Sequence, residues 1–192
     1  MPEEKFSPEE SLQIIQSMIN QVKSSVKNNS FYLLLWGWLV FAAAVLHFGI
    51  MKFTTFDKPW LAWNLMWIGV VVSIVNGIKQ SKREKVKTYI GETMRFFGIS
   101  QGIIFCSLAF IFGYYNLWHF SFPIYLLIYA AACFFMGSVL HFSLLMWAGL
   151  SCLLIMVVSM FVDYEWQLLL MALAVMISYI IPGHVLKTKE NN

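Results

Sequence analysis

The distribution of charged residues is the feature that most constrains the fold of this chain. The 67 residues from Phe96 to Val162 contain no Asp, Glu, Lys or Arg. Only 12% of the 192 residues are charged and 59% are hydrophobic, whereas about a quarter of a soluble domain is charged. Most of the surface must therefore face lipid. Because hydrocarbon cannot pair free backbone groups, we expect an all-α integral membrane protein.

The chain contains enough apolar sequence for six transmembrane helices. A helix needs about 20 apolar residues to cross a hydrocarbon core about 30 Å thick. The long uncharged run can supply three of them, with turns at 116–121 and near His141. Within a membrane domain of residues 31–186 we predict spans at about 31–51, 59–78, 96–115, 122–140, 144–162 and 166–186. The acidic N-terminus lacks the pattern of a cleaved signal peptide, so we expect it to be retained.

The orientation follows from the basic residues. Six crossings place both termini on one side, together with residues 1–30, the loop 79–95 and the tail 187–192. Eleven of the 13 Lys and Arg residues lie in these segments, and Lys52 and Lys58 lie on the other side. Cytosolic loops carry the excess of Lys and Arg, so both termini are predicted to be cytosolic. Trp60, Trp63, Trp118, Tyr164 and Trp166 then become aromatic anchors at the outer interface.

An amphipathic cytosolic helix is predicted within residues 1–30, ahead of the first span. The segment Ser7–Glu10 has an N-cap residue, a proline and two acids, which is typical of a helix start. An apolar stripe at spacings of three and four follows: Leu12, Ile15, Ile19, Val22 and Val26. Such a helix lies on the membrane surface, packs under the bundle or pairs with another helix, and the sequence leaves these alternatives open.

The basic loop 79–95 is the second candidate contact surface. Its charges allow helical extensions of the second and third spans. Lys82, Arg83, Lys85 and Lys87 could attract anionic lipid headgroups, at about 1 kcal/mol each, or could serve only to set the orientation. These four residues, with Leu12, Ile15, Ile19 and Val22, are the predicted partner or lipid contacts.

Two segments suggest an internal repeat. Residues 31–48 and 125–142 both end in Val-Leu-His-Phe and share a leucine and a phenylalanine at matching positions. A weak 3+3 inverted repeat, as in several transporter folds, is one interpretation. Chance similarity between apolar segments is the other.

Few residues in the spans could carry chemistry. No predicted span holds a carboxylate, Lys or Arg, which argues against a proton- or ion-coupled pump. The serines lack a Gly-x-Ser-x-Gly setting, so we predict no enzyme and no catalytic residue. The basic residues form no patch interleaved with aromatic residues, so no nucleic-acid partner is expected.

Histidines and cysteines are the side chains of this chain that could bind a haem or a metal ion. His47 and His119 fall near the outer face, and His141 and His184 near the inner face. Haem or metal ligation needs two histidines at one depth on facing helices. No metal motif accompanies these pairs, so no cofactor and no metal are predicted. Three cysteines (Cys106, Cys133 and Cys152) are expected to be buried thiols.

Most of the remaining polar and small residues are of types that favour packing between helices. Asn64, Asn76, Gln101 and Gln167 are expected to form hydrogen bonds between helices. The motif Gly98-x-x-x-Gly102 favours close helix packing, either within the bundle or in a dimer.

Three stretches carry a resemblance. They are ESLQIIQSMINQVK with SFYLLLWGWLVFAA, then SIVNGIKQSKREKVKTYI, then YEWQLLLMALAVMISYIIPGHVLK. They resemble uncharacterised small multi-pass membrane proteins of Bacteroidota bacteria, over nearly the whole chain. The resemblance implies a bacterial inner-membrane protein with an amphipathic N-terminal helix, and it implies no activity.

The leading hypothesis is therefore a non-enzymatic protein with a scaffolding or regulatory role. Its cytoplasmic face would contact membrane lipids and a protein partner or a second copy of the chain. The alternative is a small carrier for an uncharged or lipid-like solute, with a polar-lined cavity near Asn64, Asn76 or Gln101. A third hypothesis is a protein with a histidine-ligated haem or metal.

Overall fold

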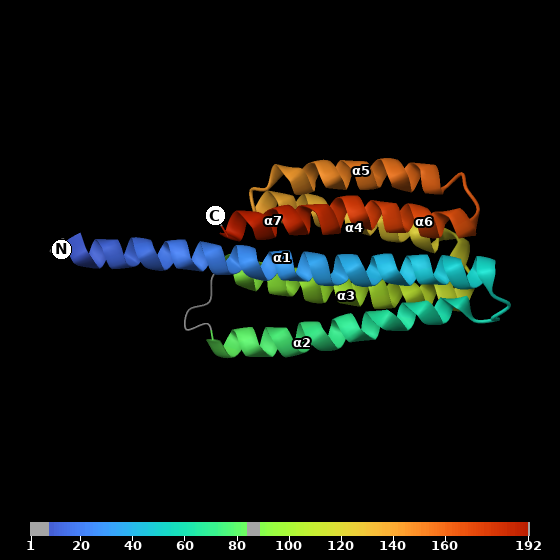
Figure 1. Cartoon of the computed structure of the whole chain (residues 1–192), viewed down its shortest axis with the longest axis horizontal. Helices are drawn as coiled ribbons and strands as arrows, with labels where there is room; N and C mark the ends of the chain where they lie inside the picture. The colour runs from blue at the N-terminus through green and yellow to red at the C-terminus, as the bar shows by residue number, and fades with distance from the viewer. Residues whose placement is uncertain (1–7, 84–88, 192) are drawn as a thin grey trace.

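The described part of the chain is entirely helical. The computed structural model describes the backbone of residues 8–83 and 89–191 and the side chains of residues 30–82 and 90–188. Its elements are α1 (Pro8–Phe53), η1 (Pro59–Asn64), α2 (Leu65–Arg83), α3 (Tyr89–Tyr115), η2 (Trp118–Phe120), α4 (Ser121–Val139), α5 (Ser143–Ser159), α6 (Tyr164–Val175), η3 (Met176–Ile180) and α7 (Ile181–Asn191) (Figure 1). The predicted all-α class is confirmed for these residues.

α1 is one unbroken helix of 46 residues. We predicted a separate amphipathic helix within 1–30, but no break divides it from the first span. The reason lies in the residues at the junction. Asn28, Asn29 and Ser30 each cost a helix well under 1 kcal/mol, and no proline follows Pro8 within α1. Figure 1 shows the N-terminal part of α1 extending beyond the other helices.

Five helices are long and apolar enough to cross a membrane. They cover Ser30–Phe53, Pro59–Lys82, Ile90–Tyr115, Trp118–Val139 and Tyr164–Thr188. The sixth apolar helix, Ser143–Ser159, is shorter, with 17 residues. As expected for the basic loop, α2 and α3 both extend into it, to Arg83 and from Tyr89.

Successive long helices run in alternating directions, so their connections gather at two ends of the bundle (Figure 1). The end where α1 finishes and α6 begins is called the Lys52 end below. The opposite end, where α2 finishes and α5 begins, is called the Lys82 end.

Residues with a left-handed backbone make two of the turns. Asn116 (φ 55°) follows α3, and His141 (φ 51°) follows α4. At the second turn the amide of Phe142 donates a 2.9 Å hydrogen bond to the carbonyl of Gly137, five residues back. This Schellman arrangement satisfies helix-end carbonyls within a very short connection. It allows α4 and α5 to fold back on each other directly.

The core lies among α1, α4, α5, α6 and α7. Its larger cluster is Val40, Phe122, Leu126, Tyr129, Ala130, Cys152, Leu168, Met171, Ala174 and Val175, and its smaller one is Leu33, Met136, Phe142, Leu145 and Leu186. Small residues bring α4 and α5 together. A Cβ atom on Gly149 would lie 3.1 Å from the carbonyl oxygen of Ala130, and one on Gly137 would lie 2.8 Å from Met146 Cγ. Ala130 and Gly137 therefore let α4 and α5 approach each other closely.

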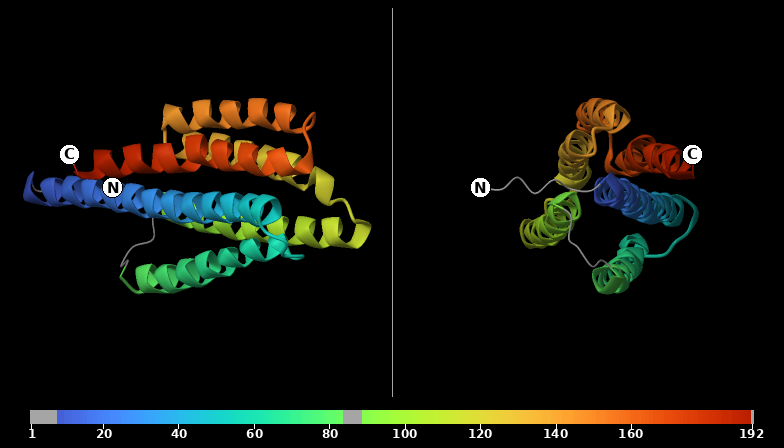
Figure 2. Two further views of the ribbon diagram at one scale, coloured as in Figure 1. Left: turned by 45° about the vertical axis from the view of Figure 1, so that its right-hand side comes forward. Right: turned by 90° about the vertical axis from the view of Figure 1, so that its left-hand side faces the viewer.

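α2 and α3 lie at the edge of the bundle, as the end-on view in Figure 2 shows. α3 packs on α4 through ring contacts, with Phe97 4.4 Å from Phe135 and Phe105 5.1 Å from Tyr125 between centroids. α2 packs mainly on α1, where Gly69 makes the closest approach. Most large hydrophobic side chains on the other faces of both helices are exposed.

Candidate functional site

The predicted contact residues lie on α1 and around the end of α2. Leu12, Ile15, Ile19 and Val22 belong to the helical backbone of α1, and their side chains lie outside the described residues, as do the side chain of Arg83 and all of Lys85 and Lys87. Lys82 is described and is exposed. The structure therefore joins the apolar stripe to the first span through one helix.

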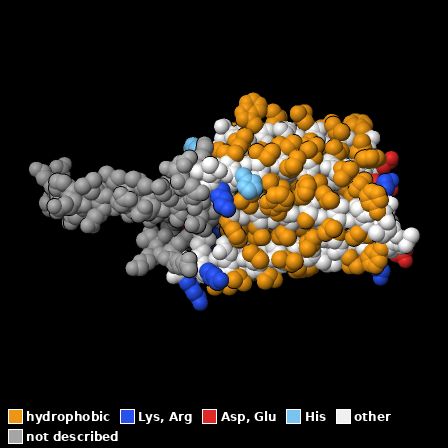
Figure 3. All heavy atoms as spheres, viewed as in Figure 1, with side chains coloured by type: hydrophobic (Ala, Val, Ile, Leu, Met, Phe, Trp, Pro, Cys, Tyr) orange, Lys and Arg blue, Asp and Glu red, His pale blue; other side chains and the backbone are white. Residues whose placement is uncertain are grey.

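Charged side chains in the described part of the chain gather near the two ends of the bundle. Lys79, Lys82 and Lys187 are exposed at the Lys82 end, and Lys52, Asp57, Lys58 and Asp163 are exposed or half-exposed at the Lys52 end. Figure 3 shows a wide hydrophobic band between the ends. The composition of this band is compatible with membrane insertion.

A buried polar cluster joins four elements at the Lys52 end. His47 of α1 is 2% exposed, and its Nδ1 accepts a 2.9 Å hydrogen bond from Nε1 of Trp63 in η1. The Tyr164 ring of α6 lies 6.0 Å from the imidazole and 5.2 Å from the Phe122 ring of α4. Because an accepting Nδ1 carries no proton, we assign the neutral imidazole with its proton on Nε2.

This arrangement gives His47 a structural task. The indole N–H of Trp63 is a donor only, and a buried donor without a partner costs about 1–3 kcal/mol. His47 supplies that partner and thereby ties η1 to α1. The sequence placed His47, Trp63 and Tyr164 near one interface, but only the fold brings them into contact.

An ion pair lies beside this cluster. Lys52 Nζ is 2.5 Å from Glu165 Oε2, and both side chains are partly exposed. The rings of Phe48 and Trp166 lie 6.1 Å apart between the same two helices. The sequence alone did not predict this pair. Its only signal was that opposite charges flank the first and last spans on the same predicted side.

The cysteines divide into two kinds. Cys133 and Cys152 are buried, as predicted, but Cys106 is exposed on α3, so the prediction for Cys106 was wrong. The reason is that α3 meets the rest of the chain mainly along α4. A cysteine elsewhere on α3 therefore faces outward, although it lies in an apolar segment.

The buried thiols face a π-helical segment. η3 interrupts the last long helix with one wider turn, which displaces backbone carbonyls from their usual partners. Cys152 Sγ lies 3.9 Å from the Ala174 carbonyl oxygen, and Cys133 Sγ lies 3.9 Å from that of Ser178. The two weak thiol donors thus serve carbonyls beside the irregular turn. The hydroxyl of Ser178 is itself buried without a hydrogen-bond partner.

The other predicted packing residues behave differently from one another. Asn76 Nδ2 donates a long hydrogen bond of 3.4 Å to Tyr32 Oη and links α2 to α1, as expected. Gln167 instead bonds locally, from Nε2 to the Val162 carbonyl at 3.2 Å. Gln101 Oε1 is buried without a partner. Gly98 and Gly102 have no atom within 4 Å of an added Cβ, which contradicts the first of the two alternatives for this motif, close packing within the bundle.

The other three histidines do not belong to the buried cluster. His119 is exposed in η2, His141 forms the left-handed turn, and His184 is exposed on α7. No group of three or more His, Cys, Asp or Glu side chains suited to a metal ion occurs within residues 8–83 and 89–191.

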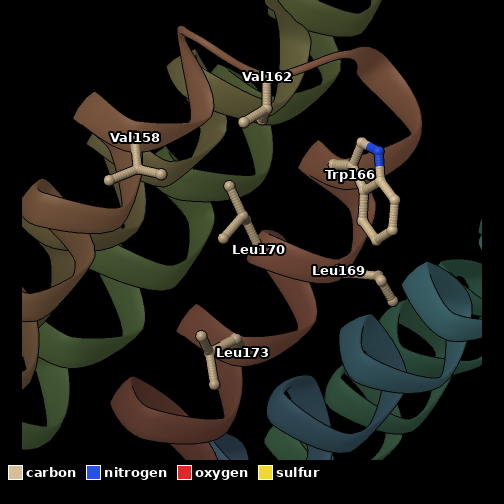
Figure 4. Close-up of a pocket in the computed structure, with 6 residues that line it drawn as sticks. All are labelled: Val158, Val162, Trp166, Leu169, Leu170 and Leu173. Atoms are coloured by element: carbon tan, nitrogen blue, oxygen red, sulfur yellow. The ribbon is translucent and has the colours of Figure 1, made fainter.

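An apolar groove lies along α6. It has a volume of about 310 Å³ and is lined by Val158, Val162, Trp166, Leu169, Leu170 and Leu173 (Figure 4). The carrier hypothesis predicted a polar-lined cavity near Asn64, Asn76 or Gln101. None of these residues lines the groove, and its walls are almost wholly hydrocarbon.

Comparisons with family models, with curated proteins and with solved structures gave no match. Functional inference for this chain therefore rests on its own residues and geometry. The geometry offers two distinct regions: a long helix that continues out of the bundle, and a polar and apolar surface at the Lys52 end.

Proposed function

We propose that this chain is a non-enzymatic scaffold or regulator in the bacterial inner membrane. It would cross the membrane six times, with α5 as the shortest crossing and both termini in the cytosol. The alternating helix directions and the excess of basic residues at one end support this topology.

The continuity of α1 is the observation that carries the proposed role. At 1.5 Å per residue, its 46 residues extend about 69 Å. The apolar window Ser30–Phe53 accounts for about 36 Å of this length. The preceding 22 residues of α1 therefore form a helical arm of roughly 33 Å beyond the membrane window.

The direction of this arm favours one of the three alternatives for the apolar stripe. A helix lies flat on the membrane surface only if it bends sharply where it leaves the bilayer. α1 has no break at that point, so its N-terminal part continues away from the membrane. An apolar stripe in water is a typical mark of a partner surface. We infer that Leu12, Ile15, Ile19 and Val22 pair with another helix.

Site-specific photocrosslinking in native membranes tests this role. A crosslinker at Ile19, within the stripe, should yield one defined protein adduct, either with a partner or with a second copy of the chain. The matched control at Gln21, on the opposite side of the helix, should give little adduct. Lipid adducts alone from Ile19, or equal adducts from both positions, would contradict the proposal.

Cysteine labelling tests the topology separately. With the native cysteines replaced, a thiol introduced at Lys58 should react with an impermeant maleimide in intact cells. A thiol at Lys5, Arg83 or Lys189 should react only after the membrane is opened. Labelling of the two termini from opposite sides would exclude an even number of crossings.

A small carrier for an uncharged or lipid-like solute is the second candidate. One observation favours it: Ser73 Oγ on α2 and Gln101 Oε1 on α3 are buried without hydrogen-bond partners. Purified protein in liposomes should then accelerate entry of neutral solutes such as glycerol, and Gln101→Leu should reduce that flux. Flux equal to that of protein-free liposomes across a panel of neutral solutes would dismiss this candidate.

A further inference from the structure

The groove on α6 has walls that suit hydrocarbon. Four of its six side chains come from two turns of α6, and the other two come from the end of α5 and the residues just after it (Figure 4). The indole nitrogen of Trp166 is the single polar side-chain atom among them. The volume of about 310 Å³ is at the lower limit of small-molecule sites. An occupant without hydrogen-bonding groups, such as an acyl chain, matches these walls.

The groove opens within the hydrophobic band rather than into the centre of the bundle. Trp166 and Leu173 are 52% and 42% exposed, and Val158 is 51% exposed. In a membrane these side chains meet lipid tails. Trp166 also marks one end of the groove, and Trp prefers the level of the lipid headgroups. The groove therefore begins at the headgroup level and runs toward the centre of the bilayer.

Charged groups border the same end. Glu165 directly precedes Trp166 and pairs with Lys52, and Asp163 is exposed two residues before Glu165. Of the charged residues at this end, Asp163 and Glu165 directly neighbour the lining residues Val162 and Trp166 in the chain, and Lys52 pairs with Glu165, so these three supply one cation and two anions. A headgroup with both a phosphate and a primary ammonium group would complement these charges, the phosphate at Lys52 and the ammonium at the two carboxylates.

The carboxylates also discriminate among headgroups. An ethanolamine ammonium offers N–H donors to carboxylate oxygens, and charge-assisted hydrogen bonds are the stronger kind. A choline group is cationic but has no N–H donor. A glycerol headgroup has no cation, and its lipid would bring a net negative charge to a border that already has an excess of carboxylates.

We propose that this groove binds one acyl chain of a phosphatidylethanolamine molecule and that Lys52, Asp163 and Glu165 hold its headgroup. The site lies at the opposite end of the bundle from the arm of α1. Its existence is therefore independent of the proposed scaffolding role, and either can fail alone.

Native mass spectrometry of the full chain tests the site. The protein is exchanged into nanodiscs with equal parts of phosphatidylethanolamine, phosphatidylcholine and phosphatidylglycerol with identical chains, and retained lipids are counted after release. We expect one phosphatidylethanolamine per chain, in roughly tenfold preference, the ratio that one charge-assisted hydrogen bond can provide. Equal retention of the three lipids, or preference for another one, would overturn the proposal.

Five variants locate the lipid: three tryptophan substitutions and two glutamine substitutions. Leu173→Trp fills the groove and should abolish retention, and Val158→Trp does so from the other wall. Leu154→Trp is the matched control, since Leu154 is 64% exposed on α5 and does not line the groove, and it should retain the lipid.

The conservative Glu165→Gln should keep a lipid but lose the ethanolamine preference, whereas Glu92→Gln on α3 should change nothing. Retention by both groove variants, or equal loss in the Leu154 control, would refute the assigned position.

Discussion

α2 and α3 differ from the rest of the bundle in packing but hardly in composition. Apolar stretches of 18 residues within Pro59–Lys82 and Ile90–Tyr115 have mean hydropathies of 1.7 and 1.9, and 6% of each stretch is buried. The corresponding stretches within Trp118–Val139 and Tyr164–Thr188 have mean hydropathies of 1.9 and 2.1, and 50% of each stretch is buried. Lipid tails are as apolar as leucine, so hydropathy reports only the absence of water. Close packing in this protein depends on shape.

Part of the shape difference can be traced to glycine. Gly137 on α4, Gly149 on α5, Gly183 on α7 and Gly37 on α1 have neighbours within about 3 Å of an added Cβ, whereas Gly77, Gly98 and Gly102 on α2 and α3 have none within 4 Å. Gly69 of α2 is the exception, because an added Cβ there would lie 2.7 Å from Leu39 Cδ1, so α2 approaches α1 closely at this one point. The halves compared by the inverted repeat also pack differently, since α4 and α5 lie close along their lengths while α2 diverges from α1 (Figure 2).

Enlarging a glycine between α4 and α5 should lower the free energy of unfolding more than any other change considered. Gly149→Leu places a side chain against the Ala130 carbonyl, a backbone atom that cannot move aside. We expect a loss of about 3 kcal/mol in the free energy of unfolding, as overpacked cores show. Gly77→Leu on α2 is the matched control and should not destabilise. SDS-induced unfolding in mixed micelles measures both, and similar losses would remove the distinction between the regions.

Truncating a large side chain should give the next largest effect. Leu168 is 0% exposed and Ile103 is 62% exposed. Leu168→Ala leaves a cavity and should cost roughly 2 kcal/mol, although lipid weakens the solvent-transfer part of that cost. Ile103→Ala removes contacts with lipid alone and should change the unfolding free energy by less than about 0.5 kcal/mol. A large loss in the α3 variant would mean that another surface covers Ile103.

Removal of the hydrogen bond between Trp63 and His47 should have a smaller effect on stability. Trp63→Phe leaves a buried acceptor without its donor, so we expect a loss of about 1 kcal/mol. Trp60→Phe, at a 56% exposed position of the same helix, is the control. In a double-mutant cycle with His47→Leu, the coupling energy should be favourable. An additive cycle would show that the contact does not stabilise the fold.

The ion pair of Lys52 and Glu165 should matter less for stability. Partly exposed pairs contribute about 0–1 kcal/mol, so Lys52→Gln should lower the unfolding free energy by about 0.5 kcal/mol, and high salt should reduce the difference. Lys58→Gln serves as the control at the same end. A loss larger than about 2 kcal/mol would indicate a much drier environment than the exposure of the pair implies.

The smallest expected effect has the opposite sign. The Ser178 hydroxyl is buried in η3 without a partner, so its removal should not destabilise the protein. Ser178→Ala should leave the unfolding free energy unchanged or raise it by up to about 1 kcal/mol. Ser159→Ala, which removes a hydroxyl bonded to the Met156 carbonyl at 2.7 Å, should destabilise. A clear loss in the Ser178 variant would point to a bound group or water at that hydroxyl.

The sequence allowed parts of this picture to be predicted. The turn at His141 could be placed because an uncharged run of 67 residues is too long for two crossings. The continuity of α1 could not, because polar residues at the junction suggested a boundary and weak helix propensities do not decide one. The burial of Cys106 was predicted wrongly because an apolar segment does not reveal which face of a helix meets the rest of the protein and which lies on the outside.

By itself, the sequence determined the apolar character of the helices and their approximate positions, since both depend on the one-dimensional pattern of charge and hydropathy. The tertiary structure decided which of these helices pack closely. It also brought His47 to Trp63, Lys52 to Glu165 and the groove on α6 to its charged border. Those outcomes depend on complementary shapes of segments far apart in the chain, and in hydrocarbon no difference in polarity marks such shapes in advance.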